Sequence, residues 1–151
     1  MIRLSTALRN SLAASYGIMP HMQGGVIYVF GGDPPPSPDS AAYPDQALGV
    51  VTTEGLTFVP PDDLNNAGLQ LEFVAPGTLI NVGRWVLTAT GAGEARWFRW
   101  YRKTFDTYED SAYYPRIDGS IGDVLVLVTP LLTVGKKTTI DSFRLQIPMG
   151  N

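Results

Sequence analysis

The chain has 151 residues, a formal net charge of −3 and no cysteine, so disulfides, thiolate metal sites and thiol catalysis are excluded. With a pI of about 5.0, a broadly basic nucleic-acid surface is not expected, and no apolar run is long enough to predict a membrane-spanning helix. The length fits one domain, and 16 glycines with 12 prolines favour many turns between short strands.

The first predicted element is a helix within residues 4–15. Ser5 is a suitable N-cap, and Gly17 a suitable C-cap. Leucines at intervals of four form an apolar stripe made of Leu4, Leu8 and Leu12, with Arg3 and Arg9 beside it. A helix this short is marginal alone in water, so it must pack on its own domain or on a neighbouring protein. The sequence leaves both possibilities open.

A strand is predicted next, at Val26–Phe30, and a proline-rich segment follows it. The consecutive prolines Pro34, Pro35 and Pro36 have no backbone N–H group and favour extended geometry. We therefore expect a stiff surface loop, which is suited to reaching a partner protein but could also pack on its own domain.

Short strands separated by turns are predicted through the middle of the chain. Their expected ranges are Leu48–Thr53, Leu56–Val59, Leu69–Phe73, Asn81–Thr90, Glu94–Lys103 and Tyr113–Ser120. The Asn81 and Glu94 strands are expected to pair around a glycine-rich turn. The last of the six is expected at a sheet edge, because Pro115 would interrupt a central ladder.

The chain ends in two further predicted strands. Val124–Val128 is an unbroken apolar run, which is typical of a strand covered on both faces. In Asp141–Pro148, Phe143, Leu145 and Ile147 alternate with polar residues, which indicates a half-buried strand.

These elements predict a mainly β fold, an antiparallel β-sandwich or jelly roll with one short N-terminal α-helix. Residues 1–151 would form a single domain, with 1–23 as an N-terminal helix or arm and 24–151 as the sandwich.

Catalytic and metal-binding patterns are weak in this sequence. His21 is the single histidine and has no nucleophile elbow to accompany it. Carboxylate pairs can be drawn at Asp62/Asp63, Glu109/Asp110 and Asp118/Asp123, but loop carboxylates of this kind are usually solvated turn residues. We expect no enzyme activity, no cofactor and no bound metal.

The densest aromatic stretch is residues 96–103. As a strand, it places Trp97 and Arg99 on one face and Trp100 on the other, so aromatic and cationic groups occur on both. One face could lie in the core, with the other exposed and carrying stacked arginines. Alternatively the stretch is a partner surface, because Trp, Tyr and Arg anchor interfaces, or it is a sugar-binding platform.

Five sequence blocks follow one another along the chain: Leu4–Leu12, Gly24–Pro35, Ala95–Arg99, Ile117–Gly122 and Leu132–Pro148. They resemble, in the same order, the motifs A-L-R-N-A-L, G-G-x-L-x-I-Y-x-G-x-x-P, A-W-x-R, D-G-S-V-G, and finally a strand containing S-F-x-L-x-x-P. Those motifs are typical of a family of small structural proteins of tailed bacteriophages, which this chain resembles. Some relatives resemble the jelly-roll cement proteins that decorate podovirus heads. The chain departs from the pattern in its proline-rich segment and in Thr104–Tyr114.

The resemblance implies a protein of the virion, made in the host cytoplasm and placed on the capsid surface. Its expected function is capsid cement or decoration: it would bind the major capsid protein, associate with further copies of itself and stabilise contacts between shell subunits, without nucleic acid or membrane. A tail or head–tail junction protein and a carbohydrate-binding module are the alternatives. The expected contact residues are Arg3, Leu4, Leu8, Arg9, Leu12, Pro34, Pro35, Pro36, Trp97 and Trp100.

Overall fold

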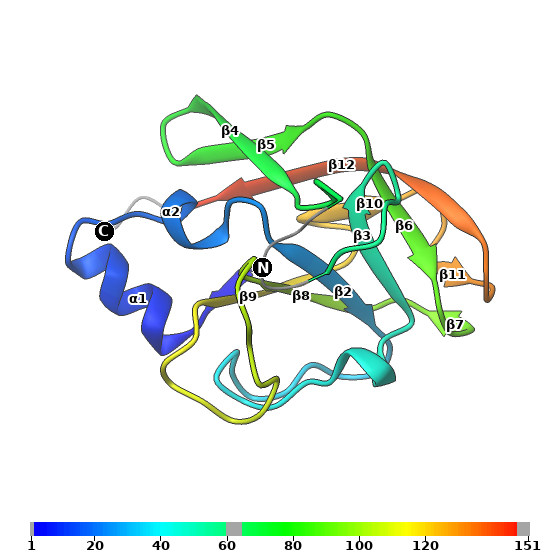
Figure 1. Ribbon diagram of the computed structural model, residues 1–151, viewed down its shortest axis with the longest axis horizontal. Helices are drawn as coiled ribbons and strands as arrows, with labels where there is room; N and C mark the ends of the chain where they lie inside the picture. The colour runs from blue at the N-terminus through cyan, green and yellow to red at the C-terminus, as the bar shows by residue number, and fades with distance from the viewer. Residues whose placement is uncertain (1, 60–64, 148–151) are drawn as a thin grey trace.

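The computed structural model describes residues 2–59 and 65–147. Within them the chain is mainly β, with a curled antiparallel sheet and one short N-terminal helix of more than one turn, as the sequence predicts (Figure 1). The candidate pair Asp62/Asp63 and the final residue of the closing strand pattern, Pro148, lie outside the described residues.

The elements alternate short strands with turns. In chain order they are β1 (Ile2–Leu4), α1 (Thr6–Ala13), α2 (Met19–Met22), β2 (Val26–Phe30), η1 (Pro44–Gln46), β3 (Gly49–Thr53), β4 (Gln70–Ala75), β5 (Thr78–Val82), β6 (Trp85–Ala89), β7 (Gly93–Glu94), β8 (Trp97–Tyr101), β9 (Arg116–Ser120), β10 (Leu125–Leu127), β11 (Leu131–Leu132) and β12 (Lys137–Gln146).

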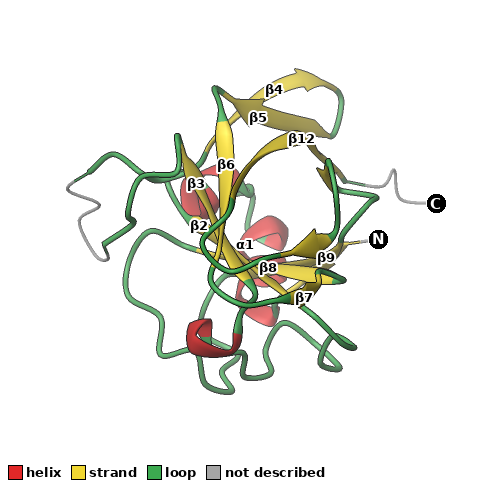
Figure 2. Cartoon of the chain, turned by 90° about the vertical axis from the view of Figure 1, so that its right-hand side faces the viewer, coloured by secondary structure: helices red, strands yellow, loops and turns green. Residues whose placement is uncertain are grey.

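Ten of the strands in the described residues form one antiparallel sheet. Its order is β1-β9-β8-β2-β3-β6-β12-β5-β4, with β10 also paired to β12, and β11 and β7 form a separate two-stranded ladder. Seen from the side, the sheet curls around its core (Figure 2). The curl is possible because β12 is long enough to pair with β6 along its first half and with β5 and β10 along its second.

Aromatic side chains from three strands, β6, β8 and β12, fill the interior of the curl. Phe143 of β12 lies 5.0 Å from Trp85, 5.3 Å from Trp100 and 5.9 Å from Phe98, measured between ring centroids. These distances suit edge-to-face and tilted contacts, which add to the free energy gained by burying the rings. Phe143 and Leu145 are both buried, so the period-two prediction for this strand is confirmed.

The N-terminal helix begins where the sequence predicts it, but Leu4 is not part of it. Ser5 caps α1 by accepting a hydrogen bond from the backbone of Leu8, whereas Leu4 belongs to β1 and pairs with Ile117 of β9. The C-cap is Ala14 and not Gly17, because the chain turns earlier, with Ser15 at φ 68°.

Three other strand predictions need correction. Leu56–Val59 forms no strand, and Asn81–Thr90 is two strands separated by Gly83, which has a φ of 75°. Neither of these two strands pairs with β8, which lies between β2 and β9 instead. Strand β9 is internal and not an edge, because it starts after Pro115 and pairs with both β1 and β8.

The apolar run at Val124–Val128 is only partly covered. Leu125 is fully buried, but Val128 is 74% exposed, so the prediction of a strand covered on both faces is wrong. Strand β10 ends at Leu127, so Val128 lies outside it, and within β10 Val126 and Leu127 are only half-buried at the margin of the sheet.

Candidate functional site

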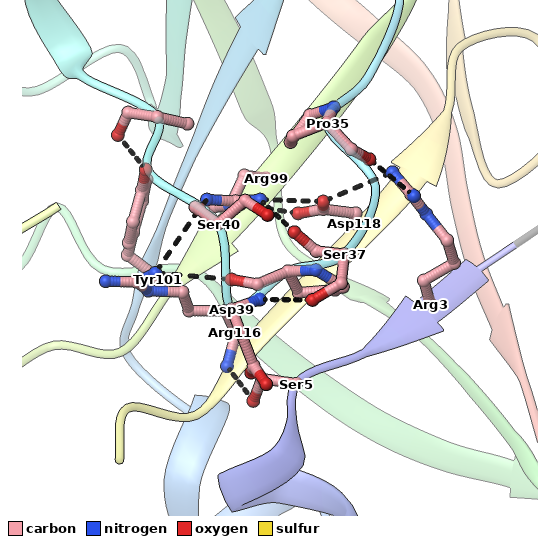
Figure 3. Close-up of polar contacts among 12 residues, drawn as sticks. Arg3, Ser5, Pro35, Ser37, Asp39, Ser40, Arg99, Tyr101, Arg116 and Asp118 are labelled. Carbon is pink, nitrogen blue, oxygen red and sulfur yellow. Dashed lines mark hydrogen bonds and ion pairs between the residues drawn. The ribbon is translucent and has the colours of Figure 1, made fainter. Parts of the chain in front are cut away.

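The proline loop, defined here as residues 31–43, packs against the face of β8 and β9 that points away from the aromatic core. Its four prolines remove four backbone donors, so the loop cannot build a ladder of its own. Its backbone carbonyl oxygens are acceptors, and arginine side chains from the sheet donate hydrogen bonds to them (Figure 3).

Three arginines and one tyrosine donate to six loop carbonyls. Arg3 donates to Pro35 at 2.6 Å and to Pro36 at 2.9 Å. Arg99 donates to Ser37 and Ser40, Arg116 donates to Pro38 and Ser40, and Tyr101 Oη–H donates to Ala42. The loop is therefore held through its backbone, which leaves the side chains of Pro34 and Pro36 exposed.

Two buried carboxylates position these arginines. Asp118 accepts two hydrogen bonds from Arg99, at 2.6 and 2.8 Å, and one from Arg3 at 3.4 Å. Asp106 binds Arg116 in the same forked way, at 2.6 and 2.9 Å. Such forked pairs are strong and directional, and burial makes each partner indispensable to the other.

These ion pairs determine the charge state of Arg99 and the net charge around it. Burial lowers the pKa of Arg99, but the hydrogen bond and attraction of Asp118 raise it above its ordinary value, so Arg99 stays charged. Asp118 serves two arginines, hence the trio of Arg3, Arg99 and Asp118 carries a net charge of +1 (two positive and one negative group).

The start of α1 is fixed to the same loop. Asp39 accepts hydrogen bonds from the backbone N–H of Thr6 at 2.8 Å and from its hydroxyl at 2.5 Å. Arg9 is exposed and donates to the same hydroxyl at 3.0 Å. The structure therefore brings the predicted residues Arg3, Arg9 and Pro34–Pro36 to one region of the molecule.

Other predicted contact residues lie inside the domain. Leu8 and Trp100 are fully buried in the core, so neither can touch a partner in this fold. Trp97 is 6% exposed and stacks on Phe30 at 4.4 Å, which leaves only an edge at the surface. Both faces of β8 are covered, one by the core and one by the proline loop, so neither proposed exposed face of this strand exists.

Leu12 lies at a different surface. It lines an apolar groove of about 330 Å³ together with Met19, Phe73, Leu79 and Ile147. Phe73 is 66% exposed there, although its place in the strand pattern predicts burial. Helix α1 thus packs Leu8 into the core, whereas Leu12 lines a groove together with residues of β4 and β5.

Two hollows flank the exposed Pro34. The smaller, about 150 Å³, is lined by Arg3, Pro34, Arg96, Trp97, Gly119 and Ser120. The larger, about 410 Å³, shares Pro34 and Arg96 and extends past Asp33 and Glu94 to Leu127 and Pro130. Arg96 therefore stands between them. It is 56% exposed, and its ion pair with Asp33 is long, at 4.0 Å.

The residues that hold the loop were not recognised as a set from sequence. The sequence places Asp118 in the predicted strand Tyr113–Ser120 but also in a carboxylate pair typical of solvated turns; in the structure it lies in β9 and is buried. A signal existed: Arg116 and Asp118 alternate with Ile117, and Arg99 alternates with core aromatics, so both strands carry charge on one face. Opposite charges facing each other on two strands indicate a buried pair, but only once the strands are known to be neighbours.

His21 and Asp118 are the next residues to place, because the sequence offers them as candidates for catalysis or metal binding. His21 lies in α2, and its Nε2 is buried without a hydrogen-bond partner among the described residues. Asp118 is held by arginines, so it is an ion-pair acceptor in this fold. In the described ranges, no three His, Asp or Glu side chains gather where they could hold a metal ion. In the same ranges, no helix has the length and apolar content needed to cross a membrane.

Tyrosines beside the arginine network have altered acidity. Burial, with a smaller effect of Tyr108, raises the pKa of Tyr28 to about 12. Burial also raises the pKa of Tyr101 above its ordinary value, although Arg99 and Arg116 act in the opposite direction. Both phenols therefore stay neutral over the physiological range.

In comparisons with protein-family models, with curated proteins and with solved structures, nothing matches this chain.

Proposed function

We propose that this protein is a capsid cement or decoration protein of a tailed bacteriophage. In this role it binds the outside of the shell, contacts the major capsid protein and stabilises the seams between shell subunits without a chemical step. The proposal combines the sequence resemblance with the presence of a rigid, exposed binding element on a small β domain.

The observation that carries the proposal is the arginine-held proline loop. Two buried ion pairs and hydrogen bonds to six carbonyls fix a segment whose outer side chains, Pro34 and Pro36, face solvent. Fixing a surface loop in advance lowers the entropy lost when it binds a partner. A loop held so firmly without contributing to the main core is best explained as a docking element.

The contact surface we propose is the proline loop with Arg3, Arg9 and the exposed edge of Trp97. One interface of this kind would be modest, since standard interfaces bury about 1,600 Å² in total. A shell offers the same site many times, so weak contacts add up to considerable mechanical stabilisation. Neighbouring copies would lie side by side on a symmetric shell, and we propose that they also associate there.

Two alternatives remain, with different support. A tail or head–tail junction protein would use the same loop against a different partner and differs mainly in copy number. The carbohydrate-binding alternative was based on exposed tryptophans, but Trp85, Trp97 and Trp100 are all buried and present no open ring face to a sugar. The structure therefore gives that alternative less support than the sequence did.

A heat-release experiment tests the proposal. Phage particles that lack this protein should release their DNA at a lower temperature than complete particles, because the seams of the shell have lost a stabilising contact. Adding the purified protein back should restore the release temperature. If particles without the protein resist heat as well as complete ones, and if the added protein does not sediment with them, the cement function is wrong.

A variant separates loop docking from simple adhesion. Replacing Pro34 and Pro36 by aspartate changes two exposed side chains and leaves the arginine contacts to the loop backbone intact. This variant should fold but fail to restore heat resistance. The matched control places aspartate at two exposed positions on β12, Ser142 and Gln146, and should restore it like the wild type.

A further inference from the structure

We propose that the small hollow between Arg3, Arg96 and Trp97 binds a single carboxylate side chain, an Asp or Glu on a surface loop of the shell protein. The inference rests on the proposed function for the identity of the partner. The chemistry of the ligand comes from the hollow itself.

Charge is the first argument. The Arg3, Arg99 and Asp118 trio carries a net positive charge, and Arg3, with 27% of its side chain exposed, brings that charge to the surface. Arg96 is the second arginine that lines the same hollow. Its long contact with Asp33, which is 99% exposed, is weak in water and easily exchanged for a better partner.

Size is the second argument. A volume of about 150 Å³ corresponds to roughly five water molecules at ~30 Å³ each. This space suits one side chain and is too small for a chain of sugars or nucleotides. Arg3 and Arg96 are the two cationic residues among those that line this space, so a carboxylate placed in it would lie beside both of them.

Preorganisation is the third argument. Arg3 is fixed by the carbonyls of Pro35 and Pro36, and Trp97 by its stacking on Phe30 and by the bond from its Nε1–H to Gly31. A carboxylate entering the hollow therefore has to order only Arg96. Because the chain as a whole is acidic, an acidic loop would be attracted here and repelled elsewhere, which would fix the orientation of the domain on the shell.

A titration followed by NMR tests the hollow directly. The probes are acetyl-Gly-Glu-Gly-amide and the matched glutamine peptide, with signals of Arg96 Nε–H and Trp97 Nε1–H as readout. The glutamate peptide should give saturable shifts at both signals and the glutamine peptide none. Arg96→Gln should weaken binding about fivefold. Arg144→Gln, an exposed arginine on β12, should bind like the wild type.

Equal shifts with both peptides, or unchanged binding by Arg96→Gln, would overturn the inference. Inorganic phosphate is titrated in parallel, and tighter binding of phosphate than of the glutamate peptide would make the hollow a small-anion site instead. Arg96 is largely exposed, so its replacement should leave the unfolding midpoint unchanged, which a urea titration checks.

Binding to particles that lack the protein links the hollow to the shell. Arg96→Glu should bind about tenfold more weakly or worse than the wild type, and Arg144→Glu equally well. If the wild type binds and Arg96→Glu binds equally, the hollow has no role on the shell. If the wild type does not bind at all, the proposed function fails, whereas the peptide titration still decides whether the hollow takes carboxylates.

Discussion

At the scale of single residues, Asp118 has the most consequential position, because it holds Arg99 in the interior and Arg3 at the surface. Replacing it by asparagine leaves two guanidinium groups facing a neutral amide, one of them fully buried. Loss of one partner of a buried pair costs about 3–5 kcal/mol. We expect Asp118→Asn to lower the free energy of unfolding in urea by about that amount.

The control for this change is Asp141→Asn, an exposed carboxylate on β12, which should alter the free energy of unfolding by less than about 0.5 kcal/mol. If Asp118→Asn were as mild as the control, the arginine network would not be what holds the proline loop.

The buried tyrosines give a prediction on alkaline pH. The folded-state pKa of Tyr28 is raised to about 12 by burial, whereas its ordinary value is 10.0, so the unfolded chain loses this proton first. The stabilisation is complete below pH 10 and is lost as the pH rises toward 12. The free energy of unfolding should therefore fall over that window, by at most roughly 3 kcal/mol from Tyr28.

Tyrosine replacement separates this effect from general alkaline unfolding. Tyr28→Phe should make the dependence between pH 10 and 12 less steep, with Tyr101 contributing to what remains, whereas Tyr113→Phe, at an 88% exposed position, should leave it unchanged. A curve that is equally steep in both variants would contradict the assignment.

At the scale of elements, the junction between β1 and α1 depends on one hydroxyl. Ser5 Oγ accepts from the backbone of Leu8 at 3.3 Å, which caps the helix, and from the backbone of Arg116 at 2.9 Å, which ties the helix to β9. Ser5→Ala removes a cap and leaves a buried N–H group without its partner. We expect a loss of about 2 kcal/mol in urea unfolding, against less than about 0.5 kcal/mol for the exposed Ser142→Ala.

Close approach of β8 and β9 gives a second prediction at this scale. A Cβ at Gly119 would lie 2.5 Å from the ring of Phe98, which is not possible without movement. Gly119→Ala should therefore destabilise the domain by about 1–3 kcal/mol. Adding Phe98→Leu should recover part of that loss, and a double-mutant cycle measures the coupling. Simple additivity of the two changes would show that the ring is not the obstacle.

Elements with a local signal were predictable, and those fixed by long-range pairing were not. The alternation around Phe143 and the cap at Ser5 identify β12 and the start of α1 from neighbouring residues alone. By contrast, Leu4 joins a strand because β9 lies beside it, and Arg99 is buried because Asp118 faces it across a ladder. No local pattern contains those partners, which are 113 residues away for Leu4 (117 − 4) and 19 for Arg99 (118 − 99).

The candidate site was only partly predictable for the same reason, because its contacts join residues that are far apart in the sequence. Proline content identifies a stiff loop in the sequence, and Arg3 lies in the expected contact set, but the bonds between them cross the chain from residue 3 to residues 35 and 36. Arg96 was not singled out, because its importance comes from the hollow that the folded loop creates.

At the scale of the whole molecule, the sheet curls around one aromatic core, and the proline loop is fastened to the outside of β8 and β9 (Figures 1 and 2). Under the proposed function, this division separates the residues that stabilise the fold from those that bind the shell. Changes on the exposed side of the loop should alter docking and leave the fold unaffected, whereas changes to the arginines beneath it should alter both. Such a molecule suits repeated use on a symmetric surface, where rigid copies bind identical sites.

The number and position of copies on purified phage particles test the cement function most directly. Imaging of the particles, with quantification of the protein against the major capsid protein, should find on the order of hundreds of copies on the outer surface of the head. About six or twelve copies in a ring at the tail or the head–tail junction would contradict the cement function, and so would absence of the protein from the particle.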